Sequence, residues 1–229
     1  MDQWNGRLDY VVNGGNSVFF KYGQNPFAEF RGLVFAAATP AEPSGNTPTQ
    51  RNGRNWVADW TSTLSPRMTF NLRAGLARWE EASGNSFGTG YDPRQLGFDS
   101  SLVAQFTRHQ FPGFVFGSYQ QLGNGSGIAP ANNDVYTIQP NFSVVHGKHL
   151  FKFGFEGRQY KETASDPGAS SGSYTFNKNW TQQRAQTADA VSGNELATFL
   201  LGYPSAASVA KNIDPYYTNR YYALFIQDD

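Results

Sequence analysis

Apolar and polar residues alternate along several paired runs of this chain, and a tight turn joins the two runs of each pair. The clearest pair spans residues 136–161 and turns at His146–His149. Its apolar residues stand at every second position: Ile138, Pro140, Phe142 and Val144 before the turn, and Phe151, Phe153 and Phe155 after it. Successive side chains of a strand point to opposite faces, so the pattern predicts a β-hairpin with one apolar and one polar face.

Two further pairs repeat the pattern. One spans residues 4–23 with a turn at 13–16, and the other spans residues 56–76 with a turn at 64–67. A last strand is expected to begin near Asn219. Single strands are expected at 114–120 and 173–177, and a short helix at 194–201, with Asn194 as its N-cap and Gly202 just past its end.

The connections between these elements differ strongly in length. Residues 24–52, 81–112, 123–133 and 162–218 are predicted to be loops or mostly irregular, whereas the hairpin turns are tight. Three connections of roughly 30 residues or more are uncommon in one soluble domain. Short turns on one side and long loops on the other are typical of a barrel in the outer membrane.

Composition agrees with this arrangement. Aromatic residues make up 16% of the 229 residues, although the mean hydropathy is −0.53. Such barrels turn apolar and aromatic residues toward lipid and polar residues toward the lumen. We therefore predict an all-β fold, a partial transmembrane antiparallel β-barrel with long extracellular loops and one short helix. Membrane strands need only about 9 to 11 residues, so the lack of a long apolar run does not exclude this fold.

Charge and cysteine content exclude other classes. The formal net charge is zero, which gives no electrostatic signature of nucleic-acid binding. The absence of cysteine excludes disulfides and thiolate metal sites. Residues 1–20 show no signal peptide, and the chain ends within a strand-like run. We therefore expect residues 1–229 to be an internal fragment of one barrel domain, without a plug domain.

Several segments resemble the barrel region of TonB-dependent outer-membrane receptors, and the likeness points to their Oar-like branch. These segments are Asn5–Tyr10 with Ser17–Tyr22, Gly147–Glu156, Leu196–Pro204 and Tyr221–Asp229. The resemblance implies about eight to ten strands of a 22-stranded barrel in the bacterial outer membrane. It also implies energy-coupled uptake of an unidentified small-molecule, glycan or peptide ligand. The TonB complex would be the partner, through a plug region not recognisable here; members of this branch often carry an N-terminal carboxypeptidase-regulatory-like domain.

Candidate chemistry is sparse. His146 and His149 are three residues apart, but no carboxylate or cysteine completes a metal-ligand set, which favours a solvated turn. The adjacent carboxylates Glu80–Glu81 and Asp228–Asp229 point to opposite faces of a strand, so neither pair can act as acid and base across a substrate. We expect no catalytic residue, no metal and no cofactor.

Charged residues of the polar faces are the first candidate functional set. They would line the lumen of the barrel: Arg7, Asp9, Asp59, Arg73, Lys152, Glu156 and Arg158. The alternative, which we favour, is a network of paired charges that holds neighbouring strands together.

Aromatic residues of the long loops are the second candidate set. As exposed groups on mobile segments they would contact a ligand: Phe87, Tyr91, Phe106, Phe111, Trp180 and Tyr203. Alternatively, these rings pack against the rim of the barrel.

Two other functions compete with transport. A secreted all-β module could bind carbohydrate through its loops, in which case a second sheet must cover the apolar face. A passive porin-like or adhesive barrel would share the fold but not the coupling to TonB.

Overall fold

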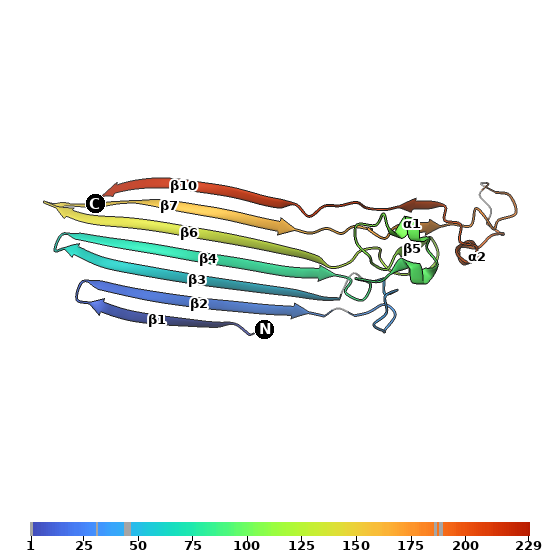
Figure 1. Cartoon of the computed structure of the whole chain (residues 1–229), viewed down its shortest axis with the longest axis horizontal. Coiled ribbons are helices and arrows are strands. Elements are labelled where there is room, and N and C mark those ends of the chain that lie inside the picture. Colours follow the sequence, from blue (N-terminus) through green and yellow to red (C-terminus); the bar gives the residue numbers. More distant parts are fainter. Residues whose placement is uncertain (1, 31, 44–46, 186, 188–189) are drawn as a thin grey trace.

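Seven long antiparallel strands form one sheet, and three short strands form a second sheet beyond one end of it (Figure 1). The computed structural model describes residues 2–30, 32–43, 47–185, 187 and 190–229. No helix among these residues is long and apolar enough to cross a membrane.

The long strands follow one another in space in the order in which they occur along the chain. They are β1 (Trp4–Asn13), β2 (Asn16–Glu29), β3 (Thr47–Ser65), β4 (Met68–Gly84), β6 (Ala129–His146), β7 (His149–Ala164) and β10 (Tyr216–Asp228). Every neighbouring pair is antiparallel. The first and last of these strands, β1 and β10, form the two edges, so the described sheet is open. The predicted all-β antiparallel fold is confirmed.

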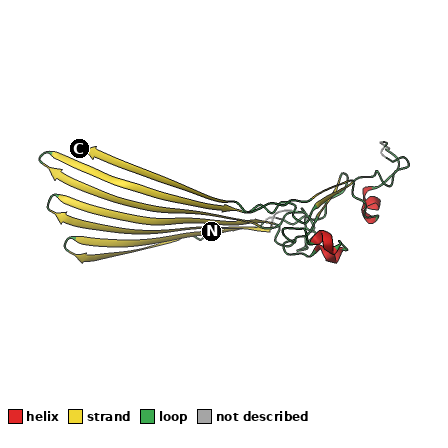
Figure 2. Ribbon diagram, turned by 45° about the horizontal axis from the view of Figure 1, so that its top comes forward, coloured by secondary structure: helices red, strands yellow, loops and turns green. Residues whose placement is uncertain are grey.

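Connections of opposite kinds lie at the two ends of the sheet. Tight turns join β1 to β2, β3 to β4 and β6 to β7 at one end. The described parts of the segments 30–46, 85–128 and 165–215 all lie at the other end, where they gather into one region (Figures 1 and 2). The predicted asymmetry of turns and loops is confirmed.

The register places the alternating residues of all seven strands on two continuous faces. Leu8 pairs with Phe20, Phe20 with Ala58, and Ala58 with Ala74, so these side chains share one face, which we call the apolar face. The opposite side, the polar face, carries the polar residues that stand between them in the sequence. No second sheet covers the apolar face among the described residues, and Leu224 on this face is 83% exposed.

The apolar face has a limited height. On β4 its apolar residues run from Met68 to Leu76, a span of about 27 Å along the strand. Strands of membrane barrels are tilted by about 35–45°, which reduces this span to a height of about 20 Å, close to the apolar band of such barrels.

Rows of aromatic rings lie toward both ends of the apolar band. At the loop end the rings of Trp4 and Tyr22 are 5.1 Å apart, and those of Tyr22 and Trp56 are 5.3 Å apart. At the turn end Phe142 lies 4.7 Å from the ring of Phe70 and 5.3 Å from that of Phe153. Aromatic girdles of this kind mark the interfaces of a bilayer with water.

Above the upper aromatic row the strands continue without a regular apolar face, with mostly polar residues on both sides. For this reason the predicted loops were too long: β2 extends to Glu29, β3 begins at Thr47 and β6 begins at Ala129, inside the segments 24–52 and 123–133. Likewise β7 and β10 extend into the segment 162–218. Alternation reveals a strand only where one face is apolar, so it gives no signal in this upper part.

Among the described residues the sheet holds seven strands, whereas eight to ten barrel strands were expected. Two segments expected as strands, β5 (Gly113–Phe116) and β8 (Ser173–Phe176), pair in parallel with each other instead of joining this sheet. The strand β9 (Ala206–Ser208) completes their small sheet. Nearby lie the short helices η1 (Pro93–Leu96), α1 (Ser100–Val103) and α2 (Glu195–Leu200).

The predicted short helix is confirmed as α2, and the local sequence explains its ends. The side chain of Asn194 accepts hydrogen bonds from the backbone N–H groups of Leu196 and Ala197, as an N-cap does. Gly202 follows the last turn with a positive φ of 74°, a conformation that favours glycine.

A charge introduced in the middle of the apolar face tests whether this face meets lipid. We expect Leu72→Arg to destabilise the protein in bilayers by about 2–4 kcal/mol, because arginine is costly near the bilayer midplane. Gln159→Arg, in the register row of Tyr136 at the upper rim, should cost at most about 1 kcal/mol. Urea titration of the folded fraction in lipid vesicles measures the stability of both variants. Equal losses of stability in the two variants would contradict a lipid-facing surface.

Candidate functional site

The expected lumen residues all lie on the polar face. One register row joins Asp9, Phe19, Asp59 and Arg73 across the first four strands. Arg7 precedes this row on β1. The other three, Lys152, Glu156 and Arg158, occupy alternate positions of β7 that face the same side.

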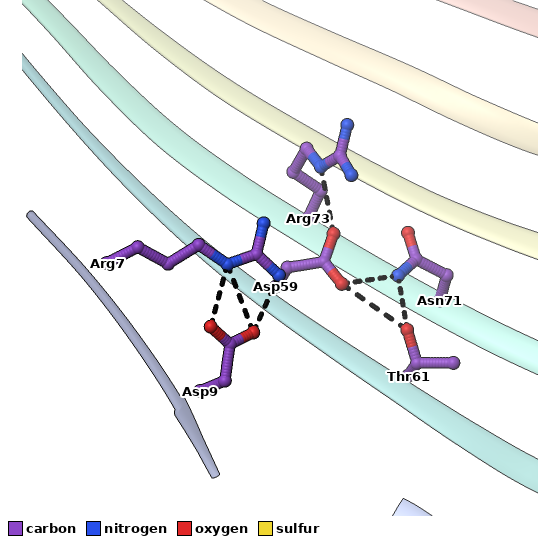
Figure 3. Close-up of polar contacts among 6 residues, drawn as sticks. All are labelled: Arg7, Asp9, Asp59, Thr61, Asn71 and Arg73. Carbon is purple, nitrogen blue, oxygen red and sulfur yellow. Dashed lines mark hydrogen bonds and ion pairs between the residues drawn. The ribbon is translucent and has the colours of Figure 1, made fainter. Parts of the chain in front are cut away.

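Asp59 is the most enclosed of these charges, with an exposed fraction of 6%. Its carboxylate accepts a hydrogen bond of 2.8 Å from Nε of Arg73 and one of 2.7 Å from Nδ2 of Asn71 (Figure 3). The hydroxyl of Thr61 donates a third hydrogen bond of 3.3 Å. Three donors from two neighbouring strands thus compensate the loss of hydration of this carboxylate.

Arg7 extends this cluster toward the edge of the sheet. Its guanidinium donates to the carboxylate of Asp9, with Nη2 at 2.6 Å from Oδ1. The same guanidinium lies 3.9 Å from the ring centre of Phe19 on β2. Because Phe19 lies between Asp9 and Asp59 in the register row, Arg7 reaches across β2 toward Asp59 (Figure 3).

The charges of β7 are paired in the same manner. Nζ of Lys152 lies 2.6 Å from a carboxylate oxygen of Asp229, and Arg158 pairs with Glu156 on its own strand. All seven expected lumen residues therefore have an oppositely charged partner. Only the pairs Asp59–Arg73 and Lys152–Asp229 join different strands or segments, whereas the other two pairs lie within one strand. The polar face thus presents a hydrated wall in which positive and negative charges are balanced.

The long connections form a second structure, which we call the loop unit: the described parts of segments 30–46, 85–128 and 165–215. Backbone contacts join the first segment to the second, since the N–H of Gly123 donates to the carbonyl of Ala41 at 2.6 Å. The second and third are joined by the parallel pair β5–β8 and by Gln110, whose side chain donates to the carbonyl of Gly168 at 2.8 Å. The three loops are thus one folded body.

Aromatic rings form the core of the loop unit. Its buried members are Phe111, Phe114, Phe116, Tyr174 and Phe176. Phe199 of α2 packs on them, with ring distances of 5.2–5.5 Å to three of these residues. Burial raises the pKa of the Tyr174 hydroxyl. Sequence reasoning missed this core, although the alternation of rings in β5 and β8 was visible.

Polar groups fix the backbone around this core. Glu42 is fully buried, and its carboxylate accepts hydrogen bonds of 3.0 Å from the N–H groups of Val34 and Phe35. Asp92 caps η1 through the N–H of Arg94, and hydrogen bonds from Arg94 lower the pKa of its carboxyl to about 2. These carboxylates hold turns of the loop unit rather than forming an open site.

The expected ligand-contacting aromatics fall into two groups, which corrects the prediction that all are exposed. Phe106 and Phe111 are buried, each with an exposed fraction of 8%. Tyr91 packs against Phe111 at a ring distance of 5.0 Å, and Phe87 is half-buried. The reason is that segments distant in the sequence pair and enclose these rings.

Trp180 and Tyr203 remain exposed, with fractions of 57% and 62%, and their rings are 6.1 Å apart. Leu200 and Leu201, at the end of α2, are exposed as well. We call these four residues the apex patch. The α2 region lies at the end of the molecule away from the tight turns (Figure 1).

Comparison with known proteins gives one family. Residues 1–229, the whole chain, match the family described as "Outer membrane beta barrel domain". The comparisons with curated proteins and with solved structures gave no match.

The cluster around Asp59 should stabilise the sheet more than the exposed pair on β1. We expect Asp59→Ala to cost about 1–3 kcal/mol, because it leaves Nε of Arg73 without its acceptor and removes one acceptor of the Asn71 amide. Asp9→Ala removes only an exposed ion pair and should cost less than about 1 kcal/mol. Urea titration in detergent micelles measures the free energy of unfolding of both variants. An equal or larger loss of stability in Asp9→Ala would contradict a stronger stabilising effect of the cluster around Asp59.

Removal of a central ring should unfold the loop unit without unfolding the large sheet. We expect Phe114→Ala to destabilise the loop unit by about 3–5 kcal/mol. Limited proteolysis should then cleave segments 85–128 and 165–215, while the β-sheet circular dichroism signal persists. Leu200→Ala is the matched control, since this side chain is exposed; collapse of the β signal in Phe114→Ala would contradict two separable units.

Proposed function

Because the chain belongs to the outer membrane beta barrel domain family and therefore lies in the bacterial outer membrane, we propose that it forms part of the wall and outer mouth of a TonB-dependent transporter. Such a protein takes up a scarce ligand by energy-coupled transport. The wall would be supplied by the seven-stranded sheet and the mouth by the loop unit.

The observation that carries this proposal is the folding of all three long connections into one body at a single end of the sheet. A body of this size, with an apex patch of aromatic and aliphatic side chains, is suited to capture a ligand before it enters the barrel. Exposed aromatics supply large contact areas at low entropic cost. The polar face below would then offer the ligand a hydrated, charge-balanced passage.

Energy coupling itself is supported by the resemblance of segments such as Gly147–Glu156 and Tyr221–Asp229 to TonB-dependent receptors. The passive porin-like or adhesive barrel is the main competitor, because it would share the sheet and could use the apex patch for adhesion. The secreted carbohydrate-binding module is disfavoured by the apolar face, since the second sheet of the structure lies beyond the strand ends and does not cover it.

Two measurements on the full-length protein separate coupled transport from a passive pore. In planar lipid bilayers a TonB-dependent transporter should conduct no ions in its resting state, whereas a porin conducts steadily. The purified periplasmic domain of TonB should also bind the protein in detergent. A steady open conductance without binding of TonB would replace our proposal by the passive barrel.

A further inference from the structure

Asparagine side chains gather in two register rows of the polar face, near its loop end. The upper row joins Asn25, Gly53, Trp79 and Asn133, and the lower row joins Asn5, Gly23 and Asn55. In the part of the chain that the structure describes, the side chains of Asn5, Asn55, Trp79 and Asn133 form no hydrogen bond, and all four are exposed. Around Asp59, by contrast, the polar groups of this face bind one another. The two rows therefore hold polar groups that a ligand can still use.

A hollow of about 460 Å³ opens at these rows. Its volume lies in the range of about 300–1,000 Å³ that is usual for sites of small ligands. The amides of Asn5, Asn25, Asn55 and Asn133 and the ring of Trp79 contribute to its lining, and Gln3, just before β1, adds a further amide. An amide supplies both donors and an acceptor, whereas the indole supplies one donor beside an apolar ring.

The polar-face side of the hollow carries no formal charge. Arg54 and Arg78 contribute to the lining, but by register they belong to the opposite face, where they pair with Glu80 and Asp134. No carboxylate of the described residues lines the hollow. The upper row continues to Glu162 on β7, which lies outside this lining. The hollow is therefore suited to a neutral ligand.

Two glycines give the hollow its shape. The ring of Trp79 occupies the space that a side chain at Gly53 would fill, since a Cβ there would lie 3.5 Å from Cε3 of the indole. A Cβ at Gly23 would collide with Oδ1 of Asn5 and lie 2.9 Å from Oδ1 of Asn55. Glycine at position 23 thus lets two amides converge, while the Trp79 side chain stays 44% exposed.

The hollow lies between the apolar band and the loop unit. Trp79 stands three residues beyond Leu76, where the apolar face ends on β4, so it lies about 10 Å farther along the strand. The strand ends at Gly84, and the loop unit follows it. A ligand that passes from the loop unit to the lumen would therefore meet the hollow on its way.

We propose that this hollow binds a sugar unit of a neutral oligosaccharide. A sugar ring combines a surface of C–H groups with hydroxyl groups that both donate and accept hydrogen bonds. The C–H groups, which are weakly positive, fit the negative face of the Trp79 indole, and the hydroxyl groups fit the surrounding amides. The inference rests on the proposed transporter, because it names the class of ligand that the wall and the mouth would admit.

Other classes of ligand match the hollow less well. An ion would leave water without meeting an opposite charge on this face, which is costly. A purely apolar ligand would cover the amides without offering them hydrogen bonds, and a polar group left unpaired in this way costs free energy. A peptide is the nearest competitor, but its backbone offers one donor and one acceptor per residue, spaced along the chain. A sugar ring brings several hydroxyl groups together around the surface that stacks on Trp79.

The test uses the full-length protein in a detergent without a sugar headgroup, with linear hexamers of glucose, mannose, galactose and xylose as probes. We expect at least one hexamer to bind, and Trp79→Ala to weaken this binding about ten-fold, as the loss of one good aromatic contact does. Trp79→Phe keeps a ring and should retain most of the affinity. Isothermal titration calorimetry measures the affinity, and circular dichroism verifies the fold. If none of the hexamers binds, the proposal is wrong.

A second variant changes the shape of the hollow without removing a polar group. The methyl group of Gly23→Ala would push the amides of Asn5 and Asn55 apart, and both can move because they end flexible side chains. We expect the fold to persist and the hexamer to bind about five-fold more weakly, as the loss of one hydrogen bond implies. Unchanged affinity in both Trp79→Ala and Gly23→Ala would overturn the proposal.

Controls decide whether the binding belongs to this hollow and to this class of ligand. Trp180→Ala removes an exposed tryptophan of the apex patch and should bind the hexamer like the parent protein. An equal loss in Trp180→Ala would overturn the proposal, because the apex patch would then be the site. Equal binding of a galacturonic acid hexamer would contradict a neutral ligand, and tighter binding of a glycine–serine hexapeptide would replace the sugar by a peptide.

These measurements need no TonB, so they are independent of the test of the proposed function. Sugar binding that depends on Trp79, in a protein with a steady open conductance, would keep the sugar site and replace the transporter by a passive barrel. A closed protein that binds TonB but none of the hexamers would keep the transporter and overturn the sugar site.

Discussion

The absence of water inside a bilayer is the constraint on which the rest of this structure depends. Backbone N–H and C=O groups in that region must bond to each other, which antiparallel ladders such as β3–β4 achieve along their whole length. The side chains that face lipid must then be apolar, and those on the opposite face are free to be polar. The alternation of Leu72 and Arg73 on β4 follows from these two requirements.

The same strands obey different rules where they leave the membrane. Above Trp56 and Leu76, water reaches both faces, so Arg54 and Arg78 can stand on the side that is apolar lower down. Strands in water no longer gain from an apolar outer face, and pairs such as Arg78–Asp134 hold them together instead. The loop unit then adds its own aromatic core, as a small soluble domain would.

These rules explain how much could be predicted from the sequence. The hairpins within the apolar band, their faces and the seven lumen candidates followed from alternation, because lipid on one side imposes period-two patterning. Strand ends such as Glu29 and Ala129 could not be predicted, since both faces are polar there. The burial of Phe111 was missed because this ring packs in a core with Phe114 of β5 and Tyr174 of β8, which are far apart in the sequence.

The same constraint applies to the two edges of the sheet. The outer sides of β1 and β10 present backbone N–H and C=O groups at the level of Leu8 and Leu224, within the apolar band. Such groups cannot face hydrocarbon unpaired, because each would cost several kcal/mol. In the membrane both edges must therefore be paired with strands, so that the wall closes. A closed wall would turn the polar face, with the charges around Asp59, into the lining of a lumen.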